Sequence, residues 1–233
     1  MRLDKFLANA GVGTRSEVKQ YIKKGLIQVN GTTVKKADLS ISESEDEILY
    51  QSKKITLQTH FYYMMNKPQG VISATEDNFQ KTVLDLLGND KRSDLFPVGR
   101  LDKDTEGLLL ITNDGDLAHR LLAPKKHVSK IYYARIQGRV TEEDVAAFQA
   151  GLDIDEDFKA LPANLKILKS DEESEIEVEI FEGKFHQVKR MFQAVGKKVV
   201  FLKRLSMGKL TLDSTLEVGK YRTLTSKELD MLL

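Results

Sequence analysis

The order of strand-like and helix-like segments constrains the fold of this chain most. Beyond residue 60, runs rich in β-branched and aromatic residues predict seven strands, at residues 61–65, 70–74, 107–112, 131–137, 160–168, 176–181 and 199–205. Helical patterns occur at residues 116–122, 141–150, 187–195 and 226–232, with Thr141 and Ser226 as expected N-caps. Because the strands do not alternate strictly with helices, a doubly wound parallel sheet is disfavoured. The sequence predicts an α+β domain with a mixed, mainly antiparallel sheet flanked by helices.

The beginning of the chain predicts a separate small module. Apolar residues recur there at helical spacing, and Thr14 with Glu17 forms a capping box for a second helix. Asn30-Gly31 separates two short β-rich runs, and this pair favours the positive backbone angles of a two-residue hairpin turn. We therefore expect a small α/β module with its linker at residues 1–57 and a larger domain at residues 58–233.

The absence of cysteine narrows the possible chemistry. Disulfides, thiolate catalysis and cysteine-ligated metal sites are excluded, and a reducing compartment is the simplest expectation. Charged residues interrupt the apolar runs, so the sequence predicts neither a signal peptide nor a membrane-spanning helix. A cytoplasmic protein without a membrane partner is expected, and nothing in the sequence demands more than a monomer.

Charge is unevenly distributed although the formal net charge is only +1. Residues 1–36 hold eight Lys or Arg against two acids, and residues 119–139 and 183–209 hold no acid at all. Acidic residues gather instead at residues 153–157 and 171–179. A single basic run is often only a solvated surface, but three of them favour a polyanion-binding face opposed by an acidic back. The expected partner is a nucleic acid.

A charged loop at residues 98–106 runs into a buried strand and is the strongest candidate for chemistry. Asp102, Asp104 and Glu106 have the spacing of a calcium loop, but Asn113 occupies the twelfth position, where a bidentate Glu is needed. We therefore expect no metal. A carboxylate beside Arg100 is expected to stay ionised, because a nearby positive charge favours the charged form. That state suits a nucleophile or a base.

This loop carries a resemblance to a known family. The run Gly99-Arg100-Leu101-Asp102-Lys103-Asp104-Thr105-Glu106-Gly107-Leu108-Leu109 resembles the central signature of the ribosomal RNA pseudouridine synthases, in both the small-subunit synthase A family and the large-subunit synthase A family. Other motifs of these families follow in order at residues 66–71, at Lys130-Ile131-Tyr132 and at residues 182–191. The block from His186 to Met191 is more similar to the small-subunit (16S) family. Residues 1–57 resemble the S4 RNA-binding domain.

The resemblance implies an isomerase that needs no cofactor. It would break the bond from N1 of a uridine to C1′ and rejoin the uracil through C5. Asp102 falls on the catalytic carboxylate, which could attack the ribose or the base, or start an elimination at the sugar. Tyr132 would stack on the uracil and help to remove the C5 proton. Lys189 would hold Asp102 charged and oriented, with Arg190 as the alternative, unless these cations simply contact phosphate.

The resemblance also implies how RNA is held. The target uridine would be flipped out of the RNA, and Arg100 would act as a wedge or a phosphate clamp. His186 would lie beside the substrate or serve only as a hydrogen-bonded structural residue. Remote, mostly sequence-independent affinity would come from Arg2, Lys5, Arg15 and Lys19. The expected substrate is 16S ribosomal RNA in a particle of the assembling small subunit. The alternatives are 23S ribosomal RNA, tRNA, or a non-catalytic S4-type assembly factor.

Overall fold

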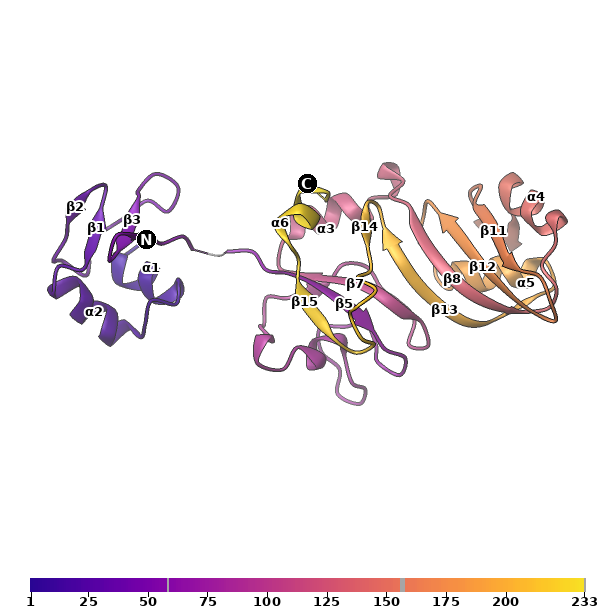
Figure 1. Ribbon diagram of the computed structural model, residues 1–233, viewed down its shortest axis with the longest axis horizontal. Helices are drawn as coiled ribbons and strands as arrows, with labels where there is room; N and C mark the ends of the chain where they lie inside the picture. The colour runs from indigo at the N-terminus through magenta and orange to yellow at the C-terminus, as the bar shows by residue number, and fades with distance from the viewer. Residues whose placement is uncertain (58, 156–157, 233) are drawn as a thin grey trace. The chain divides into compact units, whose positions relative to one another are not determined.

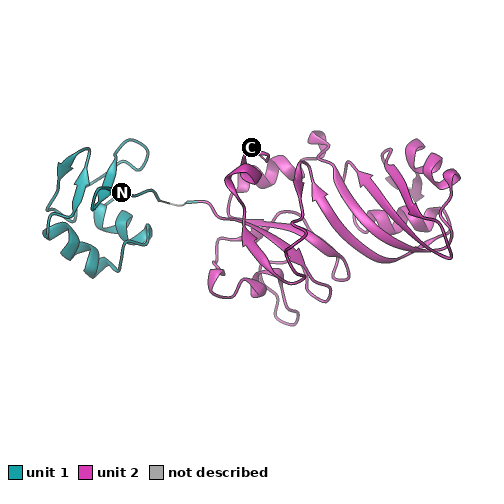
Figure 2. Cartoon of the chain, in the orientation of Figure 1, with its two compact units in different colours: residues 1–59 teal, residues 60–233 magenta. Residues whose placement is uncertain are grey.

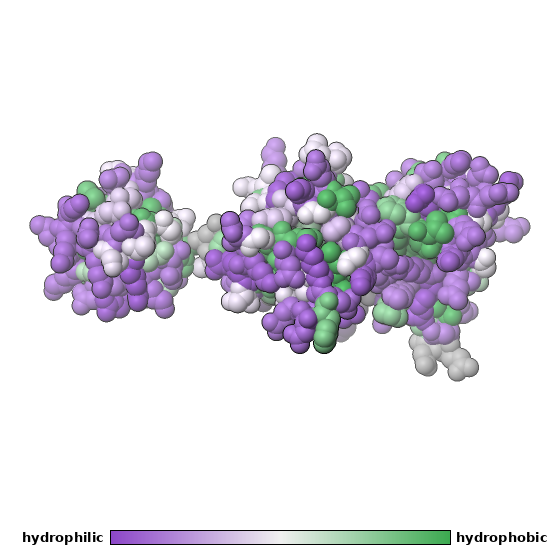
Figure 3. Space-filling view, turned by 90° about the horizontal axis from the view of Figure 1, so that it is seen from below, coloured by the Kyte–Doolittle hydropathy of each residue, from purple (hydrophilic) through white to green (hydrophobic). Residues whose placement is uncertain are grey.

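The computed structural model describes residues 1–57, 59–155 and 158–232, and the chain forms two compact units, Met1–Thr59 and His60–Leu233 (Figures 1 and 2). Glu156 and Asp157, which belong to the predicted acidic patch, lie outside the described residues. The first unit has one buried apolar cluster and the second has two, so each unit contains the packing that holds it together. Both units expose mainly hydrophilic side chains on the face shown in Figure 3.

The first unit combines two helices with a small antiparallel sheet. Its elements are α1 (Leu3–Asn9), α2 (Arg15–Lys23), β1 (Ile27–Val29), β2 (Thr32–Thr33), β3 (Ile48–Tyr50) and β4 (Lys53–Lys54). The strands are ordered β2-β1-β3-β4. The capping box of Thr14 and Glu17 begins α2 as the sequence predicts. Asn30 and Gly31 both adopt positive φ in the turn between β1 and β2.

The second unit is built on one large sheet. Its strands are β5 (Tyr62–Lys67), β6 (Phe96–Pro97), β7 (Glu106–Thr112), β8 (Lys130–Gln137), β9 (Asp153–Asp155), β10 (Phe158–Lys159), β11 (Asn164–Lys169), β12 (Glu173–Ile180), β13 (Lys198–Met207), β14 (Leu210–Thr211) and β15 (Tyr221–Thr223). The helices are η1 (Val83–Asp90), α3 (Gly115–Leu122), η2 (Pro124–Lys126), α4 (Glu142–Ala150), α5 (Gln187–Ala194) and α6 (Ser226–Asp230).

The strand order of this sheet is β11-β12-β8-β13-β7-β5-β15, with β14 beside β13 and β6 beside β7. Every pairing in it is antiparallel except that of β13 with β7, which is parallel. The strands β9 and β10 pair separately as a two-stranded sheet. The predicted α+β class with a mixed, mainly antiparallel sheet is therefore confirmed.

A glycine permits the parallel pairing of β7 with β13. Gly107 has φ +103°, and a Cβ there would lie 2.3 Å from the carbonyl oxygen of Arg204. No side chain fits between the two backbones, so glycine lets β7 approach β13. This contact matters for the site because the charged loop leads directly into β7.

Three local expectations from the sequence are wrong. Residues 70–74 form no strand and make only an isolated bridge from Ile72 to Thr82, because Gly70 turns the chain at φ +82°. The strand expected from residue 160 begins at Asn164 instead. The backbone amides before it donate to residues 152 and 148, and Pro162 has no amide hydrogen for a ladder. The last helix is capped by Thr225, whose hydroxyl accepts from the Glu228 amide, rather than by Ser226.

The basic and acidic segments meet in the folded chain. Arg190 pairs with Asp155, and Arg135 lies 2.9 Å from Glu173, so acids from both predicted patches neutralise cations from the acid-poor segments. None of the helices that the structure describes is long and apolar enough to cross a membrane.

Candidate active site

Asp102 lies in the loop between β6 and β7. Hydrogen bonds hold the backbone of this loop in place. The hydroxyl of Ser73 bridges the amide and carbonyl of Leu101, at 3.0 Å and 2.9 Å. The Thr105 amide donates to the carbonyl of Asp102 at 3.0 Å, which closes a turn around the carboxylate-bearing residue. The loop therefore presents Asp102 from a defined backbone conformation.

Lys67 supplies the strongest of these supports. Its buried ammonium donates to the carbonyls of Asp102, Thr105 and Pro68, at 2.9 Å, 2.9 Å and 3.1 Å. Burial lowers the pKa of Lys67 to about 8, although the charge of Asp102 opposes this shift. In the sequence Lys67 belongs to a motif, but no role was predicted for it. The available signal was a lysine at the end of the strand β5, directly after Tyr63, Met64, Met65 and Asn66.

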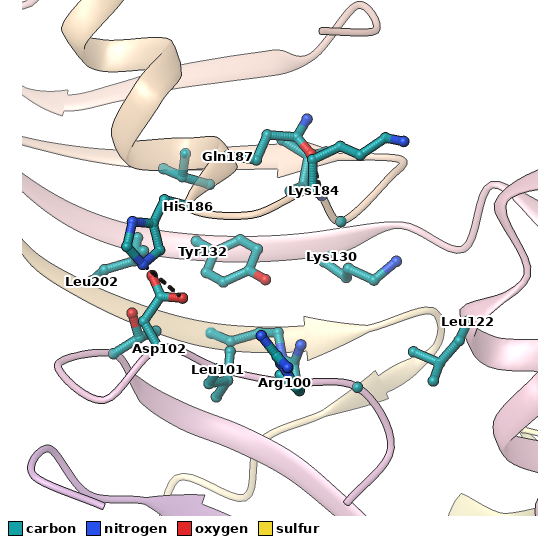
Figure 4. Close-up of a pocket in the computed structure, with 16 residues that line it drawn as sticks. Arg100, Leu101, Asp102, Leu122, Lys130, Tyr132, Lys184, His186, Gln187 and Leu202 are labelled. Carbon is teal, nitrogen blue, oxygen red and sulfur yellow. Dashed lines mark hydrogen bonds and ion pairs between the residues drawn. The ribbon is translucent and has the colours of Figure 1, made fainter. Parts of the chain in front are cut away.

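The carboxylate of Asp102 has two neighbours from the start of α5. Lys189 Nζ lies 2.9 Å from Oδ2 of Asp102 and 2.6 Å from Oδ1 of Asp104. His186 Nε2 lies 3.6 Å from Oδ1 of Asp102 (Figure 4). Burial alone would lower the pKa of Lys189, but its hydrogen bonds to the two carboxylates outweigh burial and raise it. Lys189 is therefore held as a cation against Asp102.

A pocket extends from Asp102 along the sheet. Tyr132 of β8 lines it and is 8% exposed, with Arg100 and Leu101 on the opposite wall (Figure 4). Tyr133 points to the other face of the strand, where its hydroxyl donates to Glu175 at 2.7 Å. Between the two tyrosines, only Tyr132 can meet a ligand in this pocket.

The structure brings some of the predicted RNA-binding residues to the pocket and leaves one away from it. Arg100 is exposed and lines both this pocket and an adjoining one lined by Phe185. His186 adopts a left-handed conformation at φ 50°, and its ring stacks on Phe185 at 3.7 Å between centroids. Arg190 instead pairs with Asp155 and lies over the ring of Phe158. Lys189, not Arg190, contacts Asp102.

In the first unit, one of the residues predicted to contact RNA is held by a hydrogen-bonded acid, and the other three are exposed. Arg2 donates two hydrogen bonds to the buried carboxylate of Asp4, at 3.0 Å and 3.1 Å, which ties its guanidinium to the fold. Lys5 on α1 and both Arg15 and Lys19 on α2 are exposed. Arg15 and Lys19 are four residues apart and so share one side of the helix.

The carboxylate of Asp102 lies in a pocket beside a tyrosine and a lysine. Across the described parts of the chain, no group of three or more His, Asp or Glu is arranged to hold a metal ion. A carboxylate beside a tyrosine and a lysine can carry out nucleophilic or acid–base chemistry directly.

Comparisons with known proteins place these features in a family. Residues 61–194 match the model for RNA pseudouridylate synthases, and residues 1–48 match the model for the S4 domain. A crystal structure of a pseudouridylate synthase superposes with a TM-score of 0.71 at 38% identity, covering 100% of both chains. The fold and the site thus define an RNA-modifying enzyme with an appended RNA-binding module.

Relatives of similar length support the same assignment. An uncharacterized RNA pseudouridine synthase of Bacillus subtilis is 48% identical, covering 100% of this chain and 98% of its own. Ribosomal small subunit pseudouridine synthase A of Vibrio cholerae is 42% identical, and the match covers 98% of this chain and 97% of that protein. Ribosomal large subunit pseudouridine synthase B of Bacillus subtilis is 37% identical, and the match covers 99% of this chain and 95% of that protein. The chain belongs to the RNA pseudouridine synthase family, which confirms the resemblance seen in its motifs.

Proposed function

We propose that this enzyme isomerises a specific uridine of 16S ribosomal RNA to pseudouridine, with Asp102 as the catalytic carboxylate acting on a flipped-out uridine. The observation that carries the proposal is the position of Asp102 at one end of the pocket lined by Tyr132, with Lys189 Nζ 2.9 Å from its carboxylate. An ion pair of this kind orients a carboxylate for attack or for proton removal.

The chemistry assigns a task to each side chain. Asp102 promotes cleavage of the bond from N1 to C1′ by attacking the ribose or the base, or by removing a sugar proton. Tyr132 stacks on the detached uracil and helps to remove the proton from C5 once C5 is bonded to C1′. Extruding the uridine from the RNA costs a few kcal/mol, which contacts from Arg100 and from the exposed cations of the first unit offset.

The substrate assignment rests on the similarity to the small-subunit enzyme of Vibrio cholerae together with the His186–Met191 block. The similarity to the large-subunit enzyme of Bacillus subtilis favours 23S ribosomal RNA as the second candidate. Pseudouridine mapping of ribosomal RNA from cells that lack this protein separates the two. We expect loss of one pseudouridine from 16S RNA; a loss confined to 23S RNA would make 23S RNA the substrate.

We also propose that the enzyme is a monomer and works in the cytoplasm, where it meets the small subunit during its assembly.

The catalytic role of Asp102 is tested by Asp102→Asn, with Asp104→Asn as the matched control. Both substitutions remove a carboxylate that contacts Lys189, but Asp104 is 69% exposed and does not line the pocket with Tyr132. Single-turnover formation of pseudouridine should fall on the order of 10³-fold or more in Asp102→Asn and less than about 10-fold in Asp104→Asn. Circular dichroism verifies the fold, and a normal rate in folded Asp102→Asn contradicts the role.

A further inference from the structure

Two buried cations lie on the same face of the sheet as Tyr132. Lys130 is two residues before Tyr132 on β8, so the two side chains point the same way. Arg204 of β13 is paired directly with Tyr132 in the antiparallel register, which places its side chain on that face too. All three line the pocket that begins at Asp102, and Figure 4 shows Asp102 and Lys130 on either side of Tyr132.

These cations are unusual because they are buried with unfilled hydrogen-bonding capacity. Arg204 is 3% exposed; its Nε donates to the carbonyl of Leu108 at 2.8 Å, whereas its Nη2 has no partner among the described residues. Lys130 is 8% exposed and its Nζ donates to the carbonyl of Val128 at 2.7 Å. In the described chain neither cation has a carboxylate within ion-pair distance.

Such an arrangement is costly unless something negative enters the pocket. Burial lowers the pKa of Lys130 and the positive charge of Arg204 lowers it further, while the charge of Glu182 opposes this shift without reversing it. Two buried positive charges beside one another, neither in an ion pair, destabilise the fold. A ligand that brings negative charge to this end of the pocket relieves that cost and is bound strongly for the same reason.

We propose that Lys130 and Arg204 bind the uracil as an anion after its bond to the ribose has broken. This inference rests on the proposed function. When the N1 to C1′ bond breaks, its electron pair leaves with the uracil, and resonance spreads the charge over N1 and the carbonyl oxygens O2 and O4. Ammonium and guanidinium N–H groups are suitable donors to these oxygens. When the uracil rejoins through C5, the pair forms the new bond to C1′, and the C5 proton departs to a base.

Holding the detached uracil also explains how it turns without escaping. A free uracil anion between Tyr132 and two fixed cations stays in the pocket while C5 replaces N1 opposite the sugar. The charge arises only as the bond breaks, so these contacts are stronger in the transition state than with intact uridine. That difference accelerates the reaction rather than merely tightening binding.

The rival role for these cations is contact with RNA phosphates, and the first experiment separates the two. Lys130→Met and Arg204→Met are compared with Lys203→Met, which removes one charge from the adjacent position of β13, facing the other side of the sheet. Single-turnover rates at saturating RNA should fall on the order of 10²- to 10³-fold in the first two variants only, with RNA affinity unchanged. If Arg204→Met does not fold, Lys130→Met decides the outcome. An unchanged rate with weaker, less salt-dependent RNA binding overturns the proposal.

A second experiment does not depend on turnover. 5-Nitrouracil is an anion at neutral pH because its nitro group withdraws electrons, whereas thymine is neutral and of similar size. Calorimetry should show that the wild-type protein prefers 5-nitrouracil, and that Lys130→Met reduces this preference by about 10-fold or more. No preference in the wild-type protein, or an undiminished one in the variant, contradicts the anion site. If the preference holds but no RNA is modified, the proposed function fails while the anion site remains.

Discussion

At the scale of single residues, Lys67 shows how a buried charge positions the loop that carries Asp102. An ammonium group has three N–H donors, and Lys67 directs them to three backbone carbonyls, two of which belong to the loop that carries Asp102. A neutral amine would have only two N–H donors for these acceptors. The charged form therefore fits the loop best, even though burial lowers the pKa of Lys67 to about 8.

This pKa gives a pH-dependent contribution to stability that Lys67→Met should remove. Between about pH 8 and the ordinary lysine value of 10.5, the unfolded chain keeps a proton that the folded chain has lost. Stability therefore rises with pH in this window, by about 2 kcal/mol from pH 8 to pH 10. Urea unfolding should show this rise in the wild-type protein relative to Lys67→Met, because all other titrating groups are shared. Parallel pH dependences in the two proteins would contradict the lowered pKa.

Some site residues could be found from the sequence and others could not. Asp102, Tyr132 and Lys189 lie in local motifs, and the alternation of β8 separates Tyr132 from Tyr133. Arg204 was counted only as one cation in a basic run. Its place opposite Tyr132 depends on the register between β8 and β13, which are joined by a long connection, and no local pattern fixes that register.

At the scale of elements, the parallel pair β7 and β13 holds the site together. β7 follows the loop of Asp102, and β13 carries Arg204, so their spacing sets the distance between the two ends of the pocket. Gly107 sits at the point where the two backbones come closest. We expect this contact to tolerate no side chain.

Gly107→Ala tests this, with Gly115→Ala as the control. The new Cβ would lie 2.3 Å from the Arg204 carbonyl oxygen, and alanine is strained at φ +103°, so β7 must shift. A loss on the order of 3 kcal/mol in unfolding free energy is expected, together with slower turnover. Gly115, at the start of α3, has no atom within 4 Å of an added Cβ and should change little. Equal stability of the two variants would contradict the argument.

The elements predicted best from the sequence have clear local signals. The capping box of α2 and the Asn30-Gly31 turn depend on residues within four positions of each other. The strand expected at residues 70–74 failed because Gly70 turns the chain at positive φ, and Val71 packs in the core cluster that holds Val83 and Leu87 of η1. η1 itself was missed: it is a 3-10 helix with left-handed Gly88 inside it, which breaks the helical periodicity.

At the scale of the whole molecule, each unit is stabilised by its own core. The apolar cluster of the first unit includes Leu3, Ile22 and Ile27, whereas the clusters of the second unit draw only on residues from Phe61 onward. The net charge of +1 is likewise unevenly distributed, because the first 36 residues carry eight basic residues and two acids. Exposed Lys5, Arg15 and Lys19 therefore make the first unit a candidate source of salt-dependent RNA affinity, separate from the chemistry.

Removing the first unit should separate affinity from turnover. A protein of residues 60–233 should remain folded and modify RNA at a similar single-turnover rate when RNA is saturating, but bind it more weakly. Each lost phosphate contact lowers the salt slope of binding by about 0.7 to 0.9, so the loss of three cations predicts a change of about two or more. The full chain with Lys5→Gln, Arg15→Gln and Lys19→Gln should reproduce this change in slope without removing the fold of the unit. An unchanged slope in both proteins would show that the RNA contacts reside in the second unit. A large fall in saturated rate would instead show that the first unit helps to place the uridine beside Asp102, since affinity alone does not limit a saturated reaction.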